Sequence, residues 1–148
     1  MSAQNNEKLV RGMFNAVNER RVDDAVKHVA DNAEWTNMAT GEVFRGPSGA
    51  RQFIQGWIGA FDNLKIDIKR VIATDKEVVT EFIGRGTHTG TLKTPNGELP
   101  ATNRKVELPC CEIATIENGK LTRGATYLDT LTMLSQLGVE EHAGAGHR

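Results

Sequence analysis

The fold is decided by the stretch KVELPCCEIATIENGKLTRGATYL, which runs from Lys105 to Leu128. Strand-like runs stand on both sides of Asn118-Gly119, and Val106, Leu108 and Cys110 alternate with polar or proline positions in the first of them. Asn-Gly between two such runs is the strongest short hairpin signal. We therefore predict a strand over 105–117, a tight turn, and an antiparallel strand over 120–128.

The residues before this hairpin continue the pattern. Ile66 and Ile68 alternate with Asp67 and Lys69 within 65–73, and 77–89 is rich in Val, Thr, Phe and Ile. Both segments are predicted strands, joined by a turn at Asp75-Lys76. Prolines and a glycine favour a loop over 92–103, and 33–38 is predicted to be a short strand.

Helical spacing of apolar residues marks the rest of the chain. The longest apolar face recurs at i, i+3, i+4 and i+7 from Ala50 to Phe61, after a predicted N-cap at Ser48. The other predicted helices cover 5–19, 22–30 and 130–137, the last ending at Gly138. Helices followed by a run of strands indicate the α+β class, with helices packed on one face of a curved antiparallel sheet. Such a sheet can enclose a small-molecule pocket.

The composition narrows the functional classes. A chain of 148 residues with 39% hydrophobic and 25% charged residues favours one globular domain. Its net charge of −1 produces no strong positive electrostatic field that would attract nucleic acid. No apolar run approaches ~18 residues, and the first residues lack a secretory pattern. We therefore expect a cytoplasmic protein that binds neither nucleic acid nor membrane.

The two cysteines, Cys110 and Cys111, are neighbours in the predicted strand. Adjacent cysteines cannot join distant segments, so we expect reduced thiols on opposite faces of that strand. Neither a CxxC pair nor an HExxH motif is present, so no metal site is predicted.

Four segments resemble one known family. They are Gly-Thr-His-Thr-Gly at 86–90, Pro-Ala-Thr-Asn-Arg-Lys-Val at 100–106, Ile-Glu-Asn-Gly-Lys-Leu at 116–121, and Tyr-Leu-Asp-Thr-Leu-Thr-Met-Leu-Ser-Gln-Leu-Gly at 127–138. Together they resemble the SnoaL-like polyketide cyclases, which have the nuclear transport factor two-like (cystatin-like) fold. The resemblance implies a cone-shaped domain over 1–138 with an internal pocket. The small and polar residues that follow predict a flexible tail over 139–148. The resemblance also implies a homodimer paired through the outer face of the sheet, and no metal or organic cofactor.

The best-known members of this family close a ring of an aromatic polyketide ester by intramolecular aldol condensation. The resemblance implies one acidic cavity residue, an Asp three positions before the Asp that precedes the final helix. Here that following residue is Asp129, so Thr126 occupies the position of the acid. A threonine cannot act as a general base near neutral pH without another group.

Glu112 is the predicted replacement for this acid. It lies where some family cyclases carry a cavity histidine, and its strand parity matches that of Cys110, Ala114 and Ile116. A buried glutamate with a raised pKa could abstract a proton next to a carbonyl. The alternative is a solvated residue at an open strand edge.

Two further residues have both a chemical and a structural interpretation. His88, at the end of the predicted strand over 77–89, could donate to a carbonyl oxygen or bond to nearby backbone. Asp129 could lie at the cavity rim or cap the last helix.

The predicted walls of the pocket are mostly aromatic. The resemblance places Trp35 in the cavity, and Asn37 shares its parity. Trp57 and Phe61 lie on the apolar helix face and could pack in the core or contact a ligand. Tyr127 has the opposite parity to Thr126 and should point away from the cavity.

These observations predict a cofactor-independent enzyme acting on a small, largely apolar carbonyl compound. Its reaction would be proton abstraction and enolate chemistry, as in aldol cyclisation or isomerisation. Glu112 would be the base, and His88 or Thr126 would donate to the developing oxyanion. Two alternatives are a binding protein that has lost the catalytic acid and an enzyme that hydrolyses epoxides.

Overall fold

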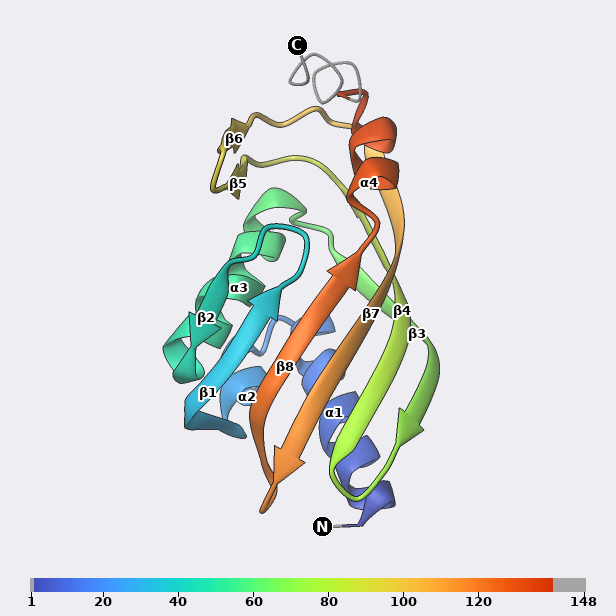
Figure 1. Cartoon of the computed structure of the whole chain (residues 1–148). Coiled ribbons are helices and arrows are strands. Elements are labelled where there is room, and N and C mark those ends of the chain that lie inside the picture. Colours follow the sequence, from blue (N-terminus) through green and yellow to red (C-terminus); the bar gives the residue numbers. More distant parts are fainter. Residues whose placement is uncertain (1, 140–148) are drawn as a thin grey trace.

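The computed structural model describes residues 2–139, in which a curved six-stranded sheet is covered on one side by helices (Figure 1). The order of strands in this sheet is β2-β1-β8-β7-β4-β3. The helices are α1 (Ala3–Asn18), α2 (Val22–Val26), α3 (Gly46–Ala60) and α4 (Thr130–Leu137). The strands are β1 (Val29–Asn37), β2 (Val43–Arg45), β3 (Lys65–Ala73), β4 (Glu77–Thr87), β5 (Leu92–Thr94), β6 (Gly97–Leu99), β7 (Lys105–Glu117) and β8 (Lys120–Leu128). The predicted α+β architecture is therefore confirmed.

The two strands of the central hairpin, β7 and β8, begin and end at the predicted residues. Asn118 and Gly119 both have positive φ angles, 51° and 76°, which a two-residue turn between twisted strands requires. Across the hairpin, Glu112 lies directly opposite Thr126. The strands of the large sheet pair antiparallel with one exception, since β1 runs parallel to β8.

Several predicted helix boundaries differ from those observed, and α1 covers 3–18 instead of 5–19. Helix α2 ends at Val26 instead of residue 30, because Val29 begins β1 and pairs with Leu121 of β8. Helix α3 begins at Gly46 with Arg45 as its N-cap, so Ser48 is not the cap. Pro47 occupies the first turn, where its fixed φ angle suits a helix start.

Three short strands were absent from the prediction. Strand β2 was not predicted, and β5 and β6 form a small hairpin inside the predicted loop over 92–103. Each has three residues, which is too short for an alternating pattern to be recognised. In addition, β4 ends at Thr87, two residues before the predicted end.

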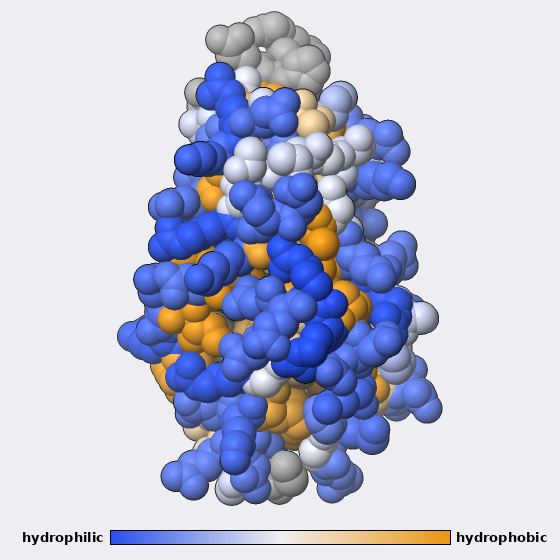
Figure 2. Space-filling model, turned by 180° about the vertical axis from the view of Figure 1, so that it is seen from behind, coloured by the Kyte–Doolittle hydropathy of each residue, from blue (hydrophilic) through white to orange (hydrophobic). Residues whose placement is uncertain are grey.

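The core fills the space between the sheet and the helices. Phe14 of α1 packs against Phe82 of β4, with ring centroids 5.1 Å apart. A second cluster, around Phe61, Leu108 and Met133, lies toward α4 and the β5–β6 hairpin (Figure 1). Polar residues cover most of the face opposite to that of Figure 1, with apolar atoms visible between them (Figure 2). Within residues 2–139, no helix has the length and apolar character needed to cross a membrane.

The last helix has the predicted end signals. Asp129 Oδ1 accepts a hydrogen bond from the backbone N–H of Thr132 (3.0 Å), and Gly138 ends the helix with a φ of 77°. Tyr127 is exposed, as its parity predicted. The homodimer through the outer face of the sheet stays a prediction. The tail over 140–148 lies outside the described residues.

Candidate functional site

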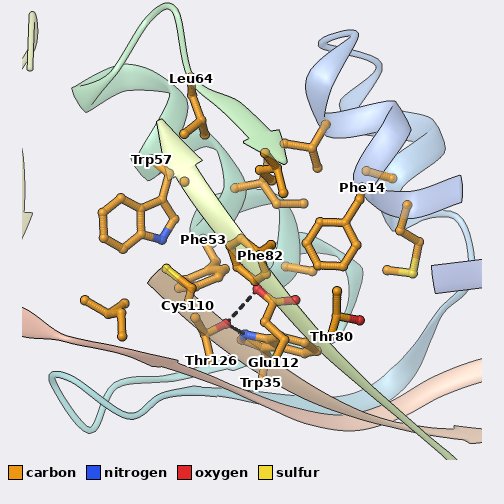
Figure 3. A pocket seen from close by; sticks show the side chains of 18 of the residues that line it. Phe14, Trp35, Phe53, Trp57, Leu64, Thr80, Phe82, Cys110, Glu112 and Thr126 are labelled. Atoms are coloured by element: carbon orange, nitrogen blue, oxygen red, sulfur yellow. Dashed lines mark hydrogen bonds between the residues drawn. The ribbon is translucent and has the colours of Figure 1, made fainter. Parts of the chain in front are cut away.

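A cavity of about 160 Å³ lies between the curved sheet and the helices. Its walls are mostly apolar, and aromatic side chains form a continuous series along it (Figure 3). The ring centroids of Trp35 and Phe53 are 6.4 Å apart, and those of Phe53 and Trp57 are 6.3 Å apart. Phe61 continues the series, with its ring stacked on Trp57. The predicted pocket residues Trp35, Trp57 and Phe61 therefore all line one cavity.

Few polar side chains reach this cavity. Among the described residues that line it, those with a side chain able to form hydrogen bonds are Trp35, Thr80, Arg85, Cys110, Glu112 and Thr126. The strand parity of Arg85, which lies opposite Glu107, directs its side chain to the outer face of the sheet. The Arg85 guanidinium forms ion pairs with Asp67 and Glu107 on the neighbouring strands. The polar part of the pocket is therefore small and lies mainly on β4, β7 and β8.

Glu112 is the carboxylate of this pocket. It lies in the middle of β7, opposite Thr80 of β4 on one side and Thr126 of β8 on the other. Burial raises the pKa of Glu112 to about 7, although the hydrogen bond from Thr126 works in the opposite direction. No Lys, Arg or His among residues 2–139 forms an ion pair with Glu112. The carboxyl group therefore titrates far closer to neutral pH than an ordinary glutamate does.

A chain of hydrogen bonds holds this carboxylate in place (Figure 3). The indole N–H of Trp35 donates to Thr126 Oγ1 (2.8 Å), and the Thr126 hydroxyl donates to Glu112 Oε2 (2.9 Å). Thr126 is only 3% exposed. Thr126 Oγ1 accepts the hydrogen bond from Trp35 through a lone pair, and its single hydrogen points to Glu112. Oε1 has no such donor among the described residues and remains able to accept a proton.

Gly124 makes room for the Trp35 ring. A Cβ atom at Gly124 would overlap the Trp35 ring. Replacing Gly124 with alanine is expected to lower the free energy of unfolding by about 1–3 kcal/mol, because the ring must move out of a packed position. Urea unfolding measures the loss.

The matched control is Gly12→Ala, at an exposed position of α1 where a Cβ meets nothing within 4 Å. This change should stabilise the protein, since alanine favours a helix interior over glycine. Equal effects of the two substitutions would contradict the packing argument.

Cys110 also lines the pocket, on the same face of β7 as Glu112. Burial raises the pKa of the Cys110 thiol to about 12, and its Sγ lies 3.4 Å from the Leu108 carbonyl oxygen as a donor. The thiol is therefore protonated and unreactive at neutral pH, and Cys110 forms part of the wall. Both cysteines are free.

Three predicted site residues do not line the pocket. His88 lies beyond the end of β4 and is completely buried, with Nδ1 accepting from the backbone N–H of Thr102 (3.1 Å). The neutral ring therefore carries its proton on Nε2, and burial lowers the pKa of His88. The Phe61 ring packs against it at 5.3 Å. This placement does not fit the predicted donation to a substrate.

Asn37 and Asp129 have structural contacts instead. Asn37 Oδ1 accepts from the backbone N–H of Ala39 (3.0 Å) and so holds the turn after β1. Asp129 is exposed and caps α4, and its bonds with Thr132 lower the pKa of its carboxyl. Neither side chain is brought to the cavity, so the predicted contacts with substrate are not supported.

Thr80 is a polar pocket residue that the sequence analysis did not single out. Its parity on β4 is that of Phe82, which also lines the cavity. The sequence shows that Thr80 and Phe82 lie on the same face of the strand. It does not show which residues of β4 lie opposite which residues of β7. The observed register places Thr80 beside Glu112.

Comparison with known families agrees with this architecture. The family model of the SnoaL-like polyketide cyclases matches residues 8–137. The chain belongs to this family. No curated protein sequence matches it. Within residues 2–139, no group of three or more His, Cys, Asp or Glu residues could hold a metal ion.

Solved structures resemble this SnoaL-like protein over nearly their whole length. A candidate SnoaL-like polyketide cyclase from Jannaschia sp. CCS1 is 15% identical, with a TM-score of 0.81 and 91% and 92% of the two chains covered. IdmH, a candidate polyketide cyclase from Streptomyces antibioticus, is 23% identical, with a TM-score of 0.72 and 90% and 98% covered. AclR, a candidate hydroxylase from Streptomyces galilaeus, is 18% identical, with a TM-score of 0.77 and 93% and 98% covered. These similarities confirm the fold, and the chemistry must be argued from the pocket.

Proposed function

We propose that this SnoaL-like protein is a cofactor-independent enzyme that removes a proton from the carbon next to a carbonyl group in a small, largely apolar compound. The enolate formed in this way would lead to aldol cyclisation or isomerisation. The observation that carries the proposal is Glu112, the carboxylate of a largely apolar pocket, held by Thr126 and with a pKa near 7.

The pKa of Glu112 suits a general base. An acid–base catalyst works best when its pKa lies near the operating pH, because it is then deprotonated often enough and basic enough. In the step proposed, the C–H bond breaks and its proton goes to Glu112 Oε1, while the electron pair moves onto the carbonyl oxygen. Where the enolate is conjugated with a second double bond, return of the proton from Glu112 to another carbon completes an isomerisation. Attack of the enolate carbon on a second carbonyl carbon closes a ring, and the alkoxide oxygen formed takes the proton back from Glu112.

The pocket favours a neutral, ring-containing ligand. A cavity of about 150 Å³ is large enough for benzene, and the pocket here is of similar size. Trp35 and Trp57 offer flat apolar surfaces for a ring. An anionic ligand would lose its hydration and meet a carboxylate, so the pocket disfavours it.

Hydrogen exchange tests the proposal without knowledge of the natural substrate. Cyclohexanone and 2-tetralone are incubated with the protein in D₂O, and NMR follows the loss of their α-hydrogen signals. We expect exchange faster than in buffer, with a rate that rises through a pH near the pKa of Glu112. Binding of these ketones without faster exchange would overturn the proposal.

That last outcome would support a second candidate, a binding protein without catalysis. Thr126 favours it, because it stands where the family resemblance places the acid. Hydrolysis of an epoxide is less well supported. Among the described residues that line the cavity, Glu112 is the one carboxylate, so no second carboxylate is available for a paired mechanism.

Filling the pocket should remove both binding and exchange. Gly84 lines the cavity on β4, and a Cβ there would meet only the Leu108 carbonyl oxygen, at 4.0 Å. We expect Gly84→Leu to weaken binding of 2-tetralone at least tenfold, because the new side chain occupies the ligand's space. NMR titration measures the affinity. Gly56→Leu, at an exposed position of α3, is the matched control and should bind 2-tetralone as the wild type does. Unchanged binding by Gly84→Leu would place the ligand elsewhere.

A further inference from the structure

The Thr80 hydroxyl is a buried polar group without a partner. Thr80 is 1% exposed, and its Oγ1 forms no hydrogen bond with any residue that the structure describes. Buried hydroxyls nearly always have a partner, because an unpaired one loses its hydration without compensation. This hydroxyl lines the cavity directly beside Glu112, on the opposite side from Thr126 (Figure 3).

The other donors in the pocket are already engaged. The Thr126 hydroxyl donates to Glu112, and the Trp35 indole N–H donates to Thr126. The Cys110 thiol is directed at the Leu108 carbonyl oxygen, and the Arg85 guanidinium forms ion pairs with acidic residues of the neighbouring strands. Among the side chains described in the cavity wall, the Thr80 hydroxyl is therefore the uncommitted neutral donor.

We propose that Thr80 donates a hydrogen bond to the carbonyl oxygen of the substrate and stabilises the enolate oxygen as charge develops. The proposal rests on the function proposed above and deepens it, since it replaces His88 and Thr126 as the predicted oxyanion donor. Neighbouring strands lie about 4.8 Å apart, so Thr80 and Glu112 can both reach one small molecule. The carbon that loses its proton and the carbonyl carbon are bonded to each other, which matches two groups side by side on adjacent strands.

This role explains why a hydroxyl is retained at the position. A donor fixed in a dry pocket stabilises developing negative charge without having to reorganise. In the free protein the same hydroxyl is destabilising, because it is buried without a partner. A valine has nearly the same shape without the hydroxyl. Thr80→Val should therefore raise the melting temperature, by about 3 °C if the gain is near that of one ordinary hydrogen bond.

Binding of phenol and toluene tests the contact directly. The two molecules have similar size, and phenol alone has an oxygen that can accept from Thr80. In NMR titrations we expect Thr80→Val to weaken phenol binding about fivefold, the contribution of one typical neutral hydrogen bond. Toluene affinity should change less than twofold, and Thr80→Ser, which keeps the hydroxyl, should bind phenol like the wild type.

Equal phenol affinities in wild type and Thr80→Val would overturn the role of Thr80. That outcome is distinct from failure of the proposed function, because these titrations require no turnover. If ketone exchange occurs in the wild type, Thr80→Val should slow it at least tenfold and leave the pH midpoint in place. Should the valine variant fold poorly, Thr80→Ala provides the same comparison between phenol and toluene.

Discussion

Replacing Glu112 with glutamine will slow α-hydrogen exchange of bound ketones by about 10²–10⁴-fold, the usual contribution of a general base. Glutamine has the shape of the glutamate and can still accept from the Thr126 hydroxyl, but it cannot take a proton near neutral pH. NMR in D₂O measures the rate, and ketone affinity should remain close to that of the wild type.

The matched control is Glu107→Gln on the same strand. Glu107 is exposed and paired with Arg85, and its parity places it on the other face of β7. An exposed ion pair contributes little, so this variant should exchange ketones at the wild-type rate. Exchange that survives in Glu112→Gln would assign the base to another group and end the role proposed for Glu112.

The same substitution should make the stability of the protein less dependent on pH. The pKa of Glu112 is about 7 in the folded protein and 4.5 as an ordinary glutamate. Below pH 4.5 both states hold the proton and the carboxyl carries no penalty. As pH rises toward 7, the unfolded chain loses its proton first, so the wild type loses stability. The loss is complete above pH 7 and is on the order of 3 kcal/mol, since each pKa unit is worth 1.36 kcal/mol.

Glutamine carries no charge at any of these pH values. Glu112→Gln should therefore match the wild type at pH 4 and exceed its free energy of unfolding by on the order of 3 kcal/mol at pH 8. Urea unfolding at pH 4, 5.5, 7 and 8 measures the difference, and the other titrating groups cancel between the two proteins. Parallel stability curves would show that the Glu112 carboxyl is well hydrated.

Sequence patterns within single segments predicted many of the helices and strands. Strands β3, β7 and β8 and helix α4 begin and end at the predicted residues, because alternation, Asn118-Gly119 and Gly138 are all signals within a few positions. Val29 and Ala30 continue a helical period, yet they join β1 because β8 offers hydrogen bonds to that strand. Contacts between distant segments overrode the local period there.

The site residues were also predictable only where a pattern within one segment, or the family resemblance, points to them. Parity alone placed Glu112 and Cys110 on one face, and the family resemblance indicated that Trp35 lines the cavity. The partnership of Glu112 with Thr80 depends on the register between strands, which no local pattern encodes. His88 has the parity of the pocket-lining residues of β4, but the strand ends before it and Phe61 packs against its ring. Alternation along a strand therefore no longer predicts the direction of a side chain once the strand has ended.

The register of the central hairpin also bears on how this protein should be compared with its relatives. Glu112 and Thr126 are 14 residues apart in the chain, but their side chains meet at one point of the cavity. A proton acceptor can therefore be encoded at either of two sequence positions while serving the same place in space. A comparison made column by column would count this protein as lacking its acid. If Glu112 is the base, as proposed, a comparison made by location in the cavity would place its carboxylate beside the position to which the family resemblance assigns an acid on the last strand.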